Sequence, residues 1–213
     1  MTHTLHRQGN LEDLKEDYVL LLRTSRFVNH EGSEETMRRV WQVISHYEKE
    51  LVNFGNHNPT WGDSEIYDME FLKTEAKSRI IHAVFKDRET IKACLKELKE
   101  TDLGISTVVS GLCGETEKIC SEIGIAPHTV NYSLGIHGNT ANMPKGEVLE
   151  IHTLCGHAMV SANLIRDMVK KIDQGKITCK AAAKRLSLMC DCGIFNTYRA
   201  EKLLERMTPD RPR

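Results

Sequence analysis

Apolar residues follow two alternating patterns along the first two thirds of the chain. Short runs that are rich in β-branched and aromatic residues have the length of strands, whereas longer segments repeat apolar residues at helical spacing. The strand-like runs are residues 17–23, 79–85, 105–110 and 129–135. The helix-like segments between them are residues 33–47, 87–98 and 115–123. The chain therefore predicts the order strand, helix, strand, helix, strand, helix, strand.

This alternation predicts an α/β or α+β fold in which helices flank a small, mainly four-stranded sheet. Two topologies fit four strands: an open sheet with right-handed crossovers, and a ferredoxin-like β-α-β-β-α-β arrangement. Of the two, the open sheet is the expectation. Residues 53–64 are rich in glycine, asparagine, histidine and proline, so they are expected to form a loop. That loop is either irregular surface structure or a lid over a pocket.

Beyond residue 146 the apolar periodicity is helical throughout. Three helices are expected there: one over residues 157–172, one over 178–189, and one that begins at Asn196 or Thr197. A loop at 138–146 separates these helices from the strands before it. The sequence thus predicts two domains. They are an α/β domain over residues 1–140 and an all-helical, cysteine-bearing module over residues 147–208.

The seven cysteines are irregularly spaced, and the first residues of the chain lack the apolar core of a secretory signal. Both observations argue against a disulfide framework. Cys94 and Cys120 lie on helical patterns and are expected to be small buried hydrophobic residues, and Cys179 has no evident role. Cys113 follows a strand in a glycine-rich segment whose outline resembles a nucleophile turn, but a plain turn is the expectation.

The other three cysteines lie at the ends of predicted helices. Cys155 comes just before the helix over 157–172, where free backbone N–H groups and the helix dipole favour a thiolate. Cys190 and Cys192 follow the next helix. A short turn at 173–176 makes the two helices antiparallel, with lengths of about 24 Å and about 17 Å. The hairpin should therefore bring Cys190 back towards Cys155.

Three thiolates in one place are typical ligands for a soft metal or for an iron–sulfur cluster. With His157 as a fourth ligand, Cys155, Cys190 and Cys192 would form a Cys3His set that suits zinc or a cluster. The absence of paired Cys-x-x-Cys motifs disfavours zinc, so the cluster is the expectation and zinc the alternative. Thiols without metal and a structural role remain open. His157 and His137 are the candidate catalytic bases beside such a site.

Charge and composition exclude several classes of partner. The chain has 29 basic and 30 acidic residues, interspersed along its length, so no nucleic acid or anionic membrane is expected. Apolar runs fall far short of the roughly 20 residues that a membrane span needs. Glycine motifs for nucleotide binding are also missing. A cytoplasmic protein is the expectation, and a protein partner, a small molecule and a homo-oligomer all remain open.

Four segments carry a resemblance to known sequences. They are Thr2-His-Thr-Leu-His-Arg7, Cys155-Gly-His-Ala-Met-Val-Ser-Ala-Asn-Leu164, Cys192-Gly-Ile-Phe-Asn196 and Arg199-Ala-Glu-Lys-Leu-Leu204. Together they resemble a family of uncharacterised proteins from methanogens and other strict anaerobes, over nearly the whole chain. The resemblance brings no established activity. It implies an anaerobic, cytoplasmic setting in which iron–sulfur proteins are common.

Two classes of function follow. In the first, a [4Fe–4S]-type cluster serves electron transfer, Lewis-acid chemistry or the delivery of clusters or sulfur. In the second, the protein is a non-enzymatic binding or assembly factor whose cysteines hold a structural zinc or stay free. The sequence does not decide whether the protein is an enzyme.

Overall fold

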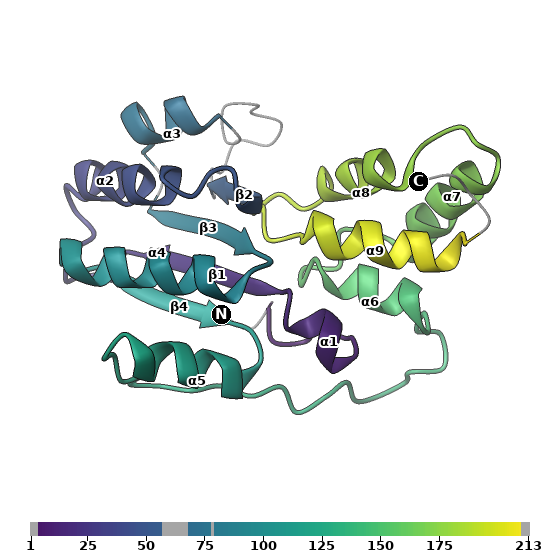
Figure 1. Cartoon of the computed structure of the whole chain (residues 1–213), viewed down its shortest axis with the longest axis horizontal. Coiled ribbons are helices and arrows are strands. Elements are labelled where there is room, and N and C mark those ends of the chain that lie inside the picture. Colours follow the sequence, from purple (N-terminus) through teal and green to yellow (C-terminus); the bar gives the residue numbers. More distant parts are fainter. Residues whose placement is uncertain (1–3, 57–67, 78, 210–213) are drawn as a thin grey trace. The chain divides into compact units, whose positions relative to one another are not determined.

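The computed structural model describes residues 4–56, 68–77 and 79–209 (Figure 1). Internal contacts divide the chain into two compact units. The sheet unit comprises Lys15–Pro127 and Asp191–Ile194, and the helical unit comprises Met1–Leu14, His128–Cys190 and Phe195–Arg213. Such units are defined by contacts and not by independent folding, so the predicted domains at 1–140 and 147–208 stay a prediction.

The sheet unit contains a four-stranded antiparallel sheet, which confirms the predicted fold class. Its strands are β1 (Tyr18–Arg23), β2 (Leu51–Asn56), β3 (Ile80–Phe85) and β4 (Ser106–Ser110). Their spatial order is β2-β3-β1-β4, and every neighbouring pair is antiparallel. Figure 1 shows α2 (Glu34–Ser45) between β1 and β2 in the chain, and α4 (Arg88–Thr101) between β3 and β4.

This connectivity is the ferredoxin-like β-α-β-β-α-β arrangement, so the expectation of an open sheet with right-handed crossovers was wrong. The difference arises from β2, which pairs antiparallel with β3 and makes the two β-α-β units interleave. The sequence pattern places residues 53–64 in a loop, yet Asn53 to Asn56 belong to β2. The remainder of that predicted loop or lid, residues 57–64, lies outside the described residues.

Tertiary packing explains why β2 forms despite its glycine and asparagine residues. Phe54 meets the buried Trp41 of α2 edge to face, with ring centroids 6.0 Å apart and an interplanar angle of 69°. Such aromatic pairs stabilise beyond their buried area by about 1 kcal/mol. The contact outweighs the weak local preference for a strand, which sequence periodicity alone could not reveal.

The strand predicted over residues 129–135 is not formed. In the structure this segment is irregular and its side chains are exposed, as Leu134 at 85% shows. It alternates apolar and polar residues as a strand does, but it pairs with none of the strands in the described part of the chain. Alternation describes a segment that fits a sheet and does not by itself supply the pairing partner.

One face of the sheet and the helices beside it form the core of the sheet unit. Two further helices, α3 (Met69–Thr74) and α5 (Cys113–Glu122), contribute to it. The predicted helical stripe of α4 is confirmed, and the Asp87 carboxylate caps this helix by accepting the Thr90 N–H at 2.7 Å. The core contains Tyr18, Leu20, Leu22, Met37, Val40, Trp41, Ile44, Ile81, Ala83, Phe85, Ile91, Cys94 and Leu95.

Cys94 is fully buried, as predicted, and burial raises the pKa of its thiol to about 12. Cys120 is only half-buried. Ser33 precedes α2 as expected, but its hydroxyl donates to the His30 carbonyl at 2.8 Å and does not cap the helix.

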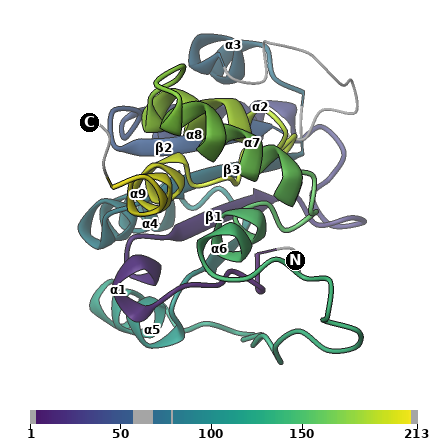
Figure 2. The same ribbon diagram turned by 90° about the vertical axis from the view of Figure 1, so that its right-hand side faces the viewer.

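The helical unit contains α1 (Leu11–Leu14), α6 (Glu147–Thr153), α7 (Ala162–Asp173), α8 (Cys179–Ser187) and α9 (Thr197–Met207) (Figure 2). Asn196 caps α9 through its side-chain oxygen, as predicted. Helix α6 was not anticipated, and α7 begins five residues later than expected because Ser161 caps it. In the described part of the chain, no helix combines the length and apolarity that a membrane crossing requires.

Buried charges tie the N-terminal segment to α6 and α9. The Arg199 side chain is 1% exposed, donates to the Gln8 carbonyl at 2.9 Å and lies 3.7 Å from the Glu150 carboxylate. The buried Asp13 carboxylate accepts two hydrogen bonds from Arg206, at 2.6 and 3.1 Å. These contacts fix the N-terminal segment within the helical unit.

The Asp13–Arg206 pair predicts a pH-dependent contribution to stability. The hydrogen bonds from Arg206 lower the pKa of Asp13, so the pair stabilises above the pKa of the unfolded carboxyl and weakens as pH falls through the folded value. Asp13→Asn should lower the free energy of unfolding by about 1 kcal/mol at neutral pH, since Arg206 is partly exposed. Urea denaturation at pH 7 and pH 3 measures the difference.

In the same network, burial raises the pKa of Glu150. The Asp13 charge also raises this pKa, so the difference between the two pH profiles reports the Asp13 carboxylate together with its coupling to Glu150. A destabilisation by Asp13→Asn that is equally large at pH 3 would contradict the assigned role of the ion pair.

Candidate metal or cluster site at Cys155 and Cys190

The helical unit brings two of the predicted ligands together. Cys155 lies two residues after the end of α6, and Cys190 follows α8. Their side chains hydrogen-bond to each other, and the residues are 1% and 0% exposed. The convergence expected from the helical hairpin is therefore confirmed for this pair.

Backbone N–H groups supply further donors to the Cys155 sulfur. Those of His157 and Met159 both hydrogen-bond to Sγ and favour the thiolate. Between them, Ala158 has a left-handed backbone with φ of 58°, and its own N–H donates to the Cys155 carbonyl at 3.0 Å. The N–H groups on either side of Ala158 thus meet at one sulfur, and backbone N–H groups that converge in a turn suit an anion.

This geometry corrects the physical origin predicted for the site. We expected the N-terminus of a helix over 157–172 to stabilise the Cys155 thiolate, but α7 begins at Ala162. The donors belong instead to the tight turn between α6 and α7. That turn is also held by His152, whose Nδ1 lies 2.8 Å from the Val160 carbonyl oxygen.

Without a cation, the Cys155 thiol is held in its neutral form. The hydrogen bond with Cys190 and then burial raise the pKa of Cys155 strongly, against the smaller opposite effect of the two N–H groups. A soft cation reverses this balance, because coordination deprotonates a thiol outright. The arrangement therefore suits a buried ligand pair better than an exposed nucleophile.

The two candidate histidines are both exposed. His157 contributes its backbone N–H to the Cys155 sulfur, while its side chain is exposed. His137 lies in the irregular segment before α6, where its Nε2 is 2.7 Å from the Leu134 carbonyl oxygen. The structure thus places the backbone of His157, and nothing of His137, at the thiol pair. Their proposed roles as ligand or base stay predictions.

Cys192 is 4% exposed and belongs to the short segment Asp191–Ile194, which is counted with the sheet unit. It follows Cys190 by two positions and stays the third predicted thiolate ligand. Among residues 4–56, 68–77 and 79–209, no three histidine, cysteine, aspartate or glutamate side chains are arranged as metal ligands.

The segment that carries Cys192 packs directly against β2, so that the two backbones are in contact. A Cβ on Gly55 would lie 2.7 Å from the Cys192 carbonyl oxygen, and a Cβ on Gly193 would lie 2.3 Å from that of Phe54. Gly193 also has a φ of 72°, which side chains disfavour. Both glycines are therefore required for this approach, and sequence reasoning missed their role although both lie in motifs that it singled out.

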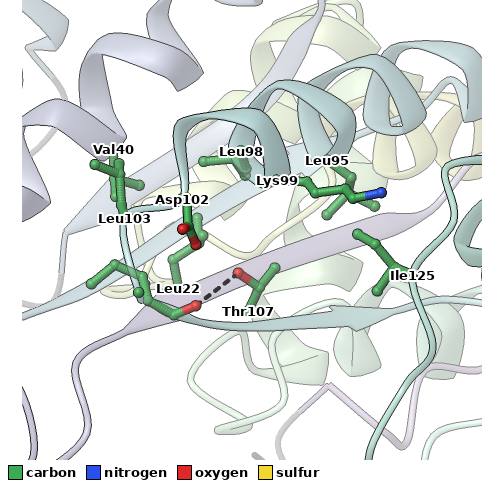
Figure 3. A pocket seen from close by; sticks show the side chains of 11 residues that line it. Leu22, Val40, Leu95, Leu98, Lys99, Asp102, Leu103, Thr107 and Ile125 are labelled. Carbon is green, nitrogen blue, oxygen red and sulfur yellow. Dashed lines mark hydrogen bonds between the residues drawn. The ribbon is translucent and has the colours of Figure 1, made fainter.

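A second candidate for ligand binding is a pocket in the sheet unit of about 290 Å³ (Figure 3). Apolar residues of β1, α2, α4 and the following loop line most of it, with Lys99, Asp102 and Thr107 as polar members. The Lys99 ammonium donates to the Ile123 and Gly124 carbonyls at 2.8 and 3.2 Å, and the Thr107 hydroxyl donates to Ile105 at 3.3 Å. The pocket offers apolar contact but no arrangement of catalytic groups.

Cys113 is the first residue of α5 and is half-buried. The plain strand-to-helix turn expected for it is what the structure shows.

The features missed at the site have weak sequence signals. The N–H donors are backbone groups of ordinary residues, and only the small residues Gly156 and Ala158 beside Cys155 hint at a tight turn. The buried Arg199 cannot be told from an exposed arginine by its neighbours in sequence. The chain matches no protein-family model, no curated protein and no solved structure.

Proposed function

We propose that this protein is an iron–sulfur protein of anaerobic metabolism that binds its cluster through Cys155 and Cys190, with Cys192 as the third thiolate. The observation that carries the proposal is the buried Cys155–Cys190 pair, with two backbone N–H groups directed at one sulfur. Thiolates are the usual ligands of such clusters, and N–H donors to sulfur tune the reduction potential. A cytoplasmic setting in a strict anaerobe, implied by the resemblance, belongs to this proposal.

Electron transfer is the role that burial supports best among those predicted. The two cysteines are 1% and 0% exposed, so their sulfur atoms are shielded from solvent. Electrons cross a layer of protein, whereas a substrate must reach the metal. Lewis-acid chemistry and cluster or sulfur delivery would each need this pair to open.

A pair of free thiols is the second candidate, because Cys155 and Cys190 hydrogen-bond directly to each other. A structural zinc site uses the same donors and fits a non-enzymatic binding or assembly factor. Metal and sulfide content distinguishes these two alternatives from a cluster: a zinc site contains zinc without sulfide, and free thiols contain neither.

Metal analysis of protein purified without oxygen tests the proposal. We expect iron and acid-labile sulfide in equal amounts, about four of each per chain for a cubane cluster, with a broad visible absorption band. One zinc per chain without sulfide would replace the cluster by a zinc site. If the protein contains neither iron nor zinc, and both thiols react with a thiol reagent after unfolding, the cysteines are free thiols and the proposal is contradicted.

A further inference from the structure

The hairpin of α7 and α8 concentrates positive charge, whereas the rest of the chain carries an excess of acidic residues. Residues 162–187 contain seven basic and two acidic residues, although the whole chain has a net charge of −1. One of these cations, Lys171, is paired with Asp167 at 2.7 Å. Lys170, Lys176, Lys180, Lys184 and Arg185 are exposed, and in the part of the chain that the structure describes none of them has an acidic partner.

The exposed face of α8 orders these charges. Lys180, Lys184 and Leu188 follow one another at intervals of four residues, as do Ala181, Arg185 and Met189, so the two rows lie side by side on the helix surface. All six residues are exposed. We call these six residues the α8 stripe; α8 itself is labelled in Figures 1 and 2.

The stripe ends in two large apolar side chains. Leu188 is 60% exposed and Met189 is 42% exposed, and Met189 directly precedes the buried Cys190. Leu188 continues the helical backbone as the C-cap of α8, so it stays in register with the cations before it. Methionine and arginine are both enriched at protein–protein interfaces, so Met189 and Arg185 fit a surface that another protein covers.

We propose that the α8 stripe is the docking surface for an acidic electron-carrier protein that exchanges electrons with the group held at Cys190. The inference rests on the proposed function, since it names the partner of the same site. Charge complementarity selects the partner: a cationic stripe attracts and orients an anionic protein. Leu188 and Met189 then supply the apolar centre of the contact, next to the residue through which the electron passes.

A nucleic acid is the other polyanion that a cationic helix can attract. The apolar end of the stripe disfavours it, because binding to a phosphate backbone uses cations and hydrogen-bond donors rather than large apolar side chains. The stripe also carries no aromatic residue on which a base could stack.

The test measures binding of a purified small acidic ferredoxin to the full-length protein by fluorescence anisotropy at low and high salt. The triple variant Lys180→Gln/Lys184→Gln/Arg185→Gln should bind about tenfold more weakly at low salt, since three exposed ion pairs are lost. The matched control Lys49→Gln/Lys96→Gln/Lys145→Gln removes the same charge from exposed positions elsewhere and should bind as the wild type does.

A second variant separates docking from a general field. Leu188→Ser/Met189→Ser should weaken binding while leaving its salt dependence unchanged, because it removes apolar contact and no charge. Three results would each overturn the proposal. The first is no ferredoxin binding at low salt, and the second is an equal loss of binding in the triple variant and its control. The third is stronger binding of a single-stranded DNA through the same three cations.

The binding assay does not depend on the cluster, so the two proposals fail separately. If the protein purified without oxygen contains no iron or sulfide but binds the ferredoxin, the missing iron contradicts the iron–sulfur assignment and the electron exchange, while the docking surface stands. If the protein contains iron and sulfide but does not bind the ferredoxin, the cluster is supported and the docking surface is contradicted.

Discussion

Gly193→Ala is expected to lower the free energy of unfolding of the sheet unit by about 3 kcal/mol. Two costs add: about 1 kcal/mol for a side chain at a φ of 72°, and about 2 kcal/mol for forcing apart two backbones that a Cβ would approach to 2.3 Å. The second cost cannot be relieved by a rotamer change, because the atoms that would clash belong to the backbones of Phe54 and Gly55.

Urea denaturation followed by tryptophan fluorescence measures this effect locally. Trp41 is buried and touches the ring of Phe54, so its emission reports the strand that the substitution would displace. A Trp61→Phe background removes the other tryptophan of the sequence. Gly32→Ala is the matched control in the same unit, because Gly32 has a φ of 70° and nothing within 4 Å of an added Cβ. Equal losses for the two variants would contradict the close approach.

Arg199→Met is expected to destabilise the helical unit by about 3 kcal/mol. Methionine keeps most of the buried apolar stem but removes a guanidinium that is 1% exposed and donates to the Gln8 carbonyl. Deleting one member of a buried charged pair is costly because the other member stays buried. Here that member is Glu150, which is 20% exposed and whose pKa is raised by burial and lowered by Arg199, and the loss of the hydrogen bond to the Gln8 carbonyl adds to the cost.

Far-UV circular dichroism during urea denaturation measures the loss. Arg185→Met makes the same chemical change in the same unit, on α8, at an exposed side chain that has no acidic partner among the described residues. It should change the free energy of unfolding by less than about 0.5 kcal/mol, because such surface substitutions have small effects. A similar cost at both positions would show that burial of Arg199 does not set the size of the effect.

The regular elements of the fold could be predicted where local pattern and tertiary packing agree. Strands β1, β3 and β4 and helix α4 have clear apolar periodicity, and the structure contains them close to their predicted bounds. Strand β2 and the segment 129–135 failed in opposite directions. The first has poor local propensity and gains its stability from Phe54 against Trp41, whereas the second has good propensity but the structure gives it no pairing partner.

The candidate site was predictable to the same extent. Helix lengths and a short turn were enough to bring Cys190 to Cys155, since both are properties of local sequence. The donors that cradle the Cys155 sulfur were not predictable, because any residue has a backbone N–H and its direction depends on the conformation of Ala158. The identity of the bound group depends on chemistry that no periodicity encodes.

The most direct test of the central claim is the iron and sulfide content of matched cysteine variants purified without oxygen. Cys155→Ser and Cys190→Ser should each lose most of both, because each removes a thiolate of the buried pair. Cys120→Ser, on α5 of the sheet unit, should retain the content of the wild type. Full iron and sulfide in Cys155→Ser or Cys190→Ser would contradict the assignment of the cluster to this pair.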